Sequence, residues 1–141
     1  MHLLDLYSHA SSSKVDKPYI LSKYFPLNCD KYITLHTTSK ETKSYQFWDE
    51  VIQLLLPILR KENISIVQIG GKGELPINGC IHTMGATSIN QSVHILQNSL
   101  LHLGCDSFPI HICSSLNKKI VGLYSNNYIS NVGPYWSKPE D

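Results

Sequence analysis

The sequence contains little charge, and neither sign dominates. Of its 141 residues, 12 are lysine or arginine and 11 are aspartate or glutamate, so the formal net charge is +1 with histidine neutral. The charges are interspersed along the chain, which leaves no basic face of the kind that binds nucleic acid and no acidic tail. Charge alone therefore indicates no partner, and we expect no interaction with nucleic acid.

Long apolar runs and closely paired cysteines are also lacking. No apolar run approaches the roughly 18 residues of a membrane-spanning helix, and the N-terminus lacks the basic start and apolar stretch of a secretory signal. The four cysteines lie far apart without a C-x-x-C pair, which argues against a zinc ribbon or a thioredoxin-like motif. We predict no transmembrane segment, reduced and mostly buried cysteines, and a soluble, cytoplasmic protein.

The length and the 42% of hydrophobic residues suit one domain with an ordinary core. The pattern changes near residue 30. Residues 1–30 mix serine, lysine and proline without sustained periodicity and indicate a linker or an extended arm. Regular apolar patterns occupy residues 31–125, and we interpret residues 126–141 as a C-terminal tail truncated from a longer protein.

The apolar patterns after residue 30 alternate between strand-like and helix-like periods. They predict the order strand, helix, strand, strand, helix, strand, helix, strand, over residues 31–36, 45–63, 64–70, 80–85, 87–99, 100–104, a helix opening at Ser107, and 119–124. Pro57 should kink the first of these helices or end it early. This alternation predicts an α/β fold, namely a Rossmann-like three-layer domain with helices on both faces of a parallel sheet.

Polar residues gather where the predicted strands end. In open parallel sheets, ligands bind at the carboxyl ends of the strands. The residues at these ends are His36, Thr37, Thr38, Ser39 and Lys43 after the first strand, Gly70, Gly71, Lys72, Gly73 and Glu74 after the second, and Cys105, Asp106, Ser107, Pro109 and His111 after the strand at 100–104. Free N–H groups at the start of the last helix attract anions. These groups could together hold a diphosphate without a metal.

Three stretches in this order resemble a known family. They are "YITLH…SKETKSYQFW", "IVQIGGKGE" and "MGATSINQSVHILQNSLLHLGCDSFPIHICSSLNKKIVGLYS". Over about residues 31–125 the chain resembles the C-terminal, donor-binding domain of heptosyltransferase-like GT-B glycosyltransferases, including their Asp-Ser-Gly-Pro-x-His signature. Two positions depart from the family pattern, since Phe108 stands in place of a glycine and Tyr45-Gln46 in place of Trp-Pro.

The resemblance implies a role for each of these residues. It assigns the donor phosphates to Thr38, Ser39, Lys43, Ser107 and His111, the ribose and base to Gly71, Glu74 and Met84, and the sugar to Asp106. It implies a nucleoside-diphosphate sugar as substrate, with no metal and no other cofactor. The catalytic base and the site for a glycan or lipid-linked acceptor are expected in an N-terminal domain, for which residues 1–30 are too few. The chain would be the donor-binding half of a glycosyltransferase, inactive alone.

Several of these residues could also have a purely structural role. Asp106 and Ser107 could only cap a helix, Lys43 could be an ordinary solvated lysine, and Glu74 could be a turn residue. His111 could be a half-buried structural histidine, as we expect for His82, His94 and His102, and a metal site at Cys105, His111 and Cys113 lacks a second pair of ligands. A non-catalytic nucleotide-sugar-binding or assembly module and a nucleotide-sugar epimerase are the alternative functions.

Overall fold

A computed structural model describes residues 1–137 and shows a single parallel sheet within them. The strands are β1 (Tyr32–His36), β2 (Ser65–Gln68), β3 (Ile81–His82), β4 (His102–Cys105) and β5 (Ile120–Leu123). Their order across the sheet is β3-β2-β1-β4-β5, and every neighbouring pair is parallel. The predicted parallel α/β sheet is therefore confirmed.

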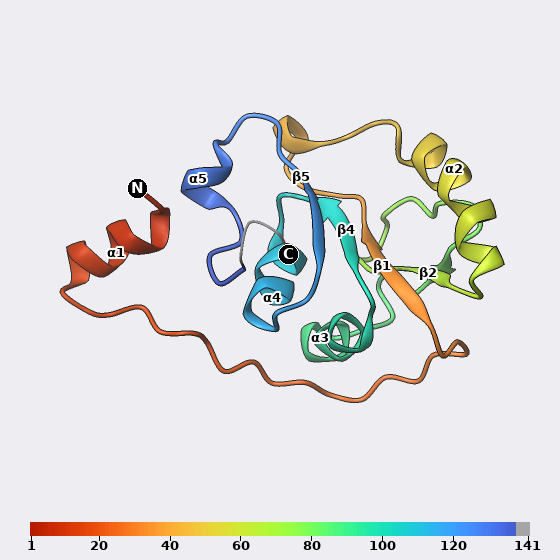
Figure 1. Cartoon of the computed structure of the whole chain (residues 1–141), viewed down its shortest axis with the longest axis horizontal. Helices are drawn as coiled ribbons and strands as arrows, with labels where there is room; N and C mark the ends of the chain where they lie inside the picture. Colours follow the sequence, from red (N-terminus) through yellow and green to blue (C-terminus); the bar gives the residue numbers. More distant parts are fainter. Residues whose placement is uncertain (138–141) are drawn as a thin grey trace.

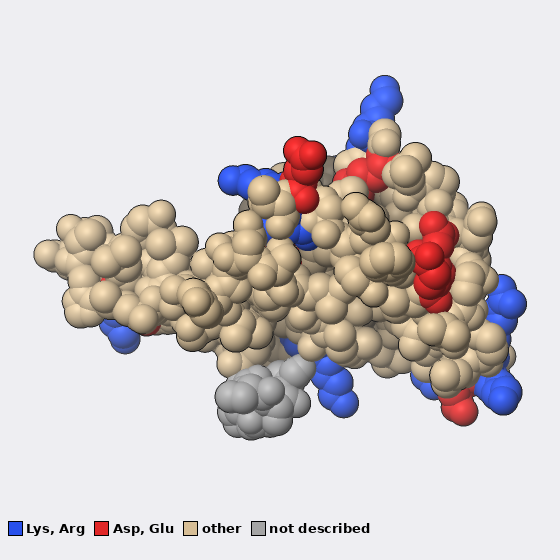
Figure 2. All heavy atoms as spheres, turned by 90° about the horizontal axis from the view of Figure 1, so that it is seen from above, with Lys and Arg blue, Asp and Glu red and all other residues tan. Residues whose placement is uncertain are grey.

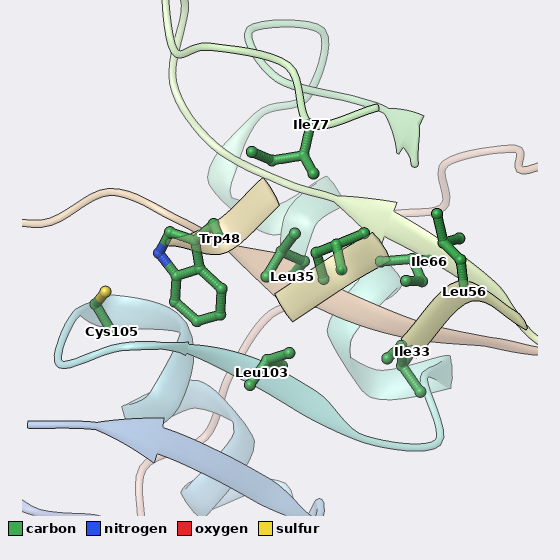
Figure 3. Close-up of a cluster of buried hydrophobic side chains, with 9 residues drawn as sticks. Ile33, Leu35, Trp48, Leu56, Ile66, Ile77, Leu103 and Cys105 are labelled. Carbon is green, nitrogen blue, oxygen red and sulfur yellow. The ribbon is translucent and has the colours of Figure 1, made fainter. Parts of the chain in front are cut away.

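One face of the sheet packs against α2 (Trp48–Lys61). Successive side chains of a strand point to opposite faces, so Ile33 and Leu35 of β1 lie on this face. Figure 3 shows them beside Trp48 and Leu56, with Leu103 of β4 below. The continuous apolar layer explains why α2 buries its Trp48, Ile52 and Leu56 stripe while its outer residues stay in water.

The opposite face carries α3 (Ile89–Asn98) and α4 (Phe108–Ser115). Tyr32 and Val67 lie in a second core cluster with Ile95 and Leu96 of α3, and the Tyr32 hydroxyl donates to the Ile95 carbonyl at 2.9 Å. Figure 1 shows α2 on one side of the sheet and α3 and α4 on the other. The three-layer arrangement is thus the predicted one.

The helix α2 continues through Pro57 to Lys61, so the expectation that Pro57 ends the helix early is wrong. Proline cannot donate the backbone hydrogen bond that would reach Gln53. Both Pro57 and Gln53 are exposed, so water can replace that bond at the Gln53 carbonyl. The buried Ile52 and Leu56 hold the helix on its other face.

The N-terminal region differs from the extended arm that the sequence suggests. Leu3–Ser11 form α1, and an extended segment follows it and passes α3, where the Lys23 N–H donates to the Asn90 carbonyl at 2.9 Å. In Figure 1, α1 lies away from the sheet and beside α5 (Ile129–Val132). The Tyr135 hydroxyl donates to Asp5 Oδ1 at 2.5 Å. Residues 138–141 of the expected tail lie outside the described residues.

His102 is fully buried at the start of β4, under the layer of α3 and α4. Its Nδ1 lies 3.0 Å from Thr34 Oγ1, and its Nε2 has no hydrogen-bond partner among residues 1–137. Burial, and secondly the neighbouring His36, lowers the pKa of His102 to about 3. The ring is therefore neutral in the native protein at ordinary pH.

We predict that His102 makes the fold acid-sensitive. In the unfolded chain a histidine has a pKa near 6.5. Between that pH and the lower pKa of native His102, the unfolded state therefore binds one proton more than the native state. The free energy of unfolding should fall by up to about 1.4 kcal/mol per pH unit from this residue as the pH drops from about 6.5 toward 3. His102→Asn should reduce the slope by about one proton, measured by urea unfolding between pH 7 and 4. The exposed His82→Asn is the control, and an unchanged slope in His102→Asn would contradict the prediction.

Candidate functional site

The sheet has its reversal of strand order at β1, which pairs with β2 on one side and with β4 on the other. Loops that leave the carboxyl ends of two such strands run in opposite directions and leave a crevice between them. The loop after β1 contains the short 3-10 helix η1 (Glu41–Lys43), and the loop after β4 leads into α4. The crevice thus lies between these two loops.

A hollow of about 450 Å³ occupies this crevice. Its lining residues are His36, Thr38, Ser39, Lys40, Lys43, Asp106 and Ser107. Five of the residues to which the resemblance gives donor roles are thus brought together, although the two loops are more than 60 residues apart in sequence. His36, which the sequence places at the end of the first strand but to which the resemblance assigns no ligand role, also lines the hollow.

Lys43 and Asp106 form an ion pair inside this hollow. Lys43 Nζ lies 2.5 Å from Asp106 Oδ2, and the carboxylate side chain is only 5% exposed. The same carboxylate oxygen accepts a hydrogen bond from Asn127 Nδ2 at 3.2 Å. The Ser39 hydroxyl donates to the Asp106 carbonyl at 2.8 Å, so the loop after β1 holds both the main chain and the side chain of Asp106.

A second hollow of about 220 Å³ adjoins the start of α4. It is lined by Phe108 and Pro109 on α4, by Gly70 and Gly71 after β2, and by His36, Ile69, Thr87, Ile89 and Ser92. His36 lines both hollows, so a ligand could extend from one hollow to the other past its ring. Phe108, the departure from the family pattern, narrows this second hollow at the helix N-terminus.

Glu74 closes the Gly-Gly turn after β2. Its Oε1 accepts a hydrogen bond from the Gly71 N–H at 2.6 Å and lies 3.9 Å from His36 Nε2. A Cβ atom on Gly70 would come within 2.3 Å of the Glu74 carboxylate, so a larger residue at this position would displace the Glu74 side chain. The second oxygen, Oε2, is buried with no partner among the described residues. Glu74 therefore stabilises the turn through Oε1, and its Oε2 has no hydrogen-bond partner among residues 1–137.

Gln68, at the end of β2, orders the loops around the site and was not indicated by the sequence analysis. It is fully buried, its Nε2 donates to the Leu75 carbonyl at 2.9 Å, and its Oε1 accepts from the Ile77 N–H at 2.8 Å. Its Nε2 also lies 3.4 Å from Thr37 Oγ1 after β1. A polar residue inside an otherwise apolar strand was the available signal.

Two predicted residues, His111 and Met84, line neither hollow, and Ser107 lines the larger hollow without capping α4. His111 is half-buried on α4 with its Nε2 4.0 Å from Asp106 Oδ1, and it lines neither hollow. Burial lowers the pKa of His111 although Asp106 raises it, so the ring is mainly neutral near pH 7. Met84 is half-buried and also lines neither hollow. Ser107 occupies the N-cap position of α4 without a side-chain capping hydrogen bond.

The described residues contain no group of three histidine, cysteine or carboxylate side chains that could hold a metal ion. Cys105 and Cys113 are buried free thiols, and burial raises the pKa of Cys113 to about 12. Figure 2 shows basic side chains scattered over one face without a continuous basic patch. Within residues 1–137, no helix is both long and apolar enough to cross a membrane.

Fold and crevice together define a Rossmann-like α/β domain with its candidate site at the switch point of a parallel sheet. The model of one protein family, glycosyltransferase family 9 (heptosyltransferase), matches residues 6–140. The chain therefore belongs to glycosyltransferase family 9, as its resemblance to heptosyltransferase-like enzymes predicted. A search of curated proteins found no match.

Solved structures share the fold at low sequence identity. A family 9 glycosyl transferase from Veillonella parvula has a TM-score of 0.66 and 20% identity over 77% of this chain and 35% of its own. The ADP-heptose lipopolysaccharide heptosyltransferase II of E. coli has a TM-score of 0.64 and 15% identity over 95% of this chain and 41% of its own. The E. coli heptosyltransferase TibC in complex with ADP-D-β-D-heptose has a TM-score of 0.59 and 15% identity over 84% and 33%. The chain thus spans about a third to two fifths of these proteins.

We predict that the Lys43–Asp106 pair stabilises the domain. Lys43→Ala leaves the nearly buried Asp106 carboxylate with Asn127 as its hydrogen-bond donor, and a hydrogen bond between charged groups contributes about 1.5–3 kcal/mol. The free energy of unfolding in urea should fall by about that amount. Lys40→Ala, at an exposed lysine of the same hollow, should change it by less than about 0.5 kcal/mol. Equal effects of the two substitutions would show that the ion pair contributes nothing.

Proposed function

We propose that the chain is the donor-binding domain of a glycosyltransferase that transfers a sugar from a nucleoside-diphosphate sugar to an acceptor hydroxyl. The observation that supports this most is the hollow at the switch point, where Lys43, the hydroxyls of Thr38 and Ser39, and the start of α4 face one space. A family 9 chain with this arrangement of two lysines, several hydroxyls and a helix N-terminus is suited to a diphosphate.

The proposed reaction breaks the bond between the anomeric carbon of the sugar and an oxygen of the diphosphate, while the acceptor oxygen forms a new bond to that carbon. The electron pair of the broken bond stays on the leaving diphosphate, which gains negative charge. Lys43, the hydroxyls of Thr38 and Ser39, and the N–H groups at the start of α4 would stabilise that charge in the transition state. The contribution of this domain is therefore to the leaving group.

The ribose and base are proposed to occupy the second hollow, beyond His36. Gly70 and Gly71 line this hollow, and Ile69 and Phe108 give apolar surface for a base. Glu74 packs against both glycines without lining the hollow itself, and its unused Oε2 is the candidate acceptor for ribose hydroxyls at the edge of the hollow. The similar TibC structure contains ADP-D-β-D-heptose, and a structure of E. coli heptosyltransferase WaaC contains ADP. Adenosine donors are therefore the first to test.

The acceptor and the base that takes its proton are proposed to belong to a second domain. The similar structures are more than twice as long as the part that this chain matches. The acceptor is proposed to be a glycan or lipid-linked hydroxyl, bound across the cleft between the two domains. On this proposal, the chain alone binds a donor and does not transfer the sugar. Its proposed location is the cytoplasm, which would supply the nucleotide sugar.

We predict that ADP, UDP or GDP binds without added magnesium and that Lys43→Ala weakens the binding more than Glu74→Gln. A charge-assisted contact to phosphate contributes about 1.5–3 kcal/mol, whereas a partly exposed hydrogen bond to a ribose contributes about 1 kcal/mol. Calorimetric titrations with and without a chelator measure both effects, on variants shown by thermal unfolding to be folded.

Two results would contradict parts of this proposal. Loss of binding with the chelator would show that the diphosphate needs a metal. Absence of binding by all three nucleoside diphosphates would favour the alternative of an assembly module that uses the same fold without a donor. Phe108 favours this alternative, because its ring stands at the helix N-terminus in place of a glycine and narrows the space for a donor.

A further inference from the structure

Lys43 in the larger hollow is paired with a carboxylate. Lys43 Nζ lies 2.5 Å from Asp106 Oδ2, and the two side chains are 22% and 5% exposed. An ammonium group that is paired this closely offers less positive charge to an entering anion than a free one. A diphosphate that binds in this hollow must therefore compete with the Asp106 carboxylate for Lys43.

Asp106 is the fixed partner of the pair. Its N–H donates to the Leu123 carbonyl at 3.0 Å, and its own carbonyl accepts from the Ser39 hydroxyl at 2.8 Å. Aspartate has a short side chain, whereas the four-carbon chain of Lys43 can reorient its ammonium group. When the pair opens, we expect Lys43 to move and Asp106 to stay.

A third loop contributes to this arrangement. Asn127, in the segment between β5 and α5, donates through Nδ2 to Asp106 Oδ2 at 3.2 Å. In the same segment, the Ser125 hydroxyl donates to the Thr42 carbonyl at 3.0 Å, directly before Lys43. The segment thus contacts both sides of the ion pair. A carboxylate that loses Lys43 would keep the Asn127 amide as a hydrogen-bond donor.

We propose that a diphosphate opens the Lys43–Asp106 ion pair by taking Lys43 as its own partner, and that Asn127 is a positioning residue that holds the Asp106 carboxylate when Lys43 leaves. This inference rests on the proposed function, because it concerns the same hollow. It adds an exchange of partners at Lys43 and a role for the loop between β5 and α5. The retained carboxylate is then oriented for a sugar hydroxyl next to the bound phosphates.

A double-mutant cycle tests the opening of the ion pair. The affinity for inorganic pyrophosphate and for ADP is measured by calorimetry in the wild type, Asp106→Asn, Lys43→Met and the double variant. If Lys43 must leave Asp106, Asp106→Asn should raise the affinity for pyrophosphate by about three- to tenfold when Lys43 is present, and by less in the Lys43→Met background. An equal or larger gain in the Lys43→Met background means simple repulsion by Asp106 and overturns the inference.

A second cycle tests Asn127 with Lys43 in place, so it decides the question if Lys43→Met binds too weakly to measure. Asn127→Ala should lower the affinity for pyrophosphate about two- to fivefold, because Asp106 then loses its remaining donor as Lys43 departs. This loss should disappear in the Asp106→Asn background, and Asn127→Gln, which keeps the amide donor, should restore part of the affinity. Asn126→Ala, at an exposed neighbour, is the matched control.

The outcomes separate the inference from the proposed function. A loss on Asn127→Ala that is the same with and without Asp106 shows a general structural role and overturns the inference, while the proposed function stands as long as ADP or another nucleoside diphosphate binds. A wild-type protein that binds neither pyrophosphate nor any nucleoside diphosphate overturns both. Thermal unfolding of each variant shows whether a loss of affinity comes from a loss of folded protein.

Discussion

The parallel pairing of β1 with both β2 and β4 is the constraint on which the candidate site depends. It brings the carboxyl ends of three strands to one edge of the sheet and makes the loops after β1 and β4 diverge. Lys43 and Asp106 meet only because of this pairing, since they are more than 60 residues apart in the chain. A different strand order would place them on separate surfaces even if every helix and strand were kept.

Buried polar groups lie along the centre of the sheet and lead to the site. Thr34 and His102 are fully buried and contact each other, and His36 at the end of β1 lines both hollows. Burial lowers the pKa of His36, although Glu74 opposes the effect, so its ring is mainly neutral near pH 7. Gln68 uses its amide to order the neighbouring loop. Hydrogen bonds from buried polar groups such as Gln68 favour a single arrangement of the loops. The shape of the hollows therefore depends on the interior of the fold.

The chain has the family 9 fold together with features of its own at the ligand edge. Phe108 stands where the family signature has glycine, and it forms part of the smaller hollow next to α4. The Lys43–Asp106 ion pair and the Asn127 contact connect three separate loops at the larger hollow.

The sequence by itself determined the alternation of strands and helices over residues 31–125, the parallel sheet, and the strand ends at which polar residues gather. These follow from local periodicity and from the rule that crossovers in a parallel sheet share one hand. Local patterns did not indicate α1, because a nine-residue helix depends on contacts such as Asp5 with Tyr135, which are distant in the chain. Only the tertiary structure decided that Lys43 pairs with Asp106, that Asn127 joins them and that His36 lies between the two hollows. The physical reason is that these contacts depend on where three separate loops lie in space, and the sequence within one loop carries no information about the positions of the other two.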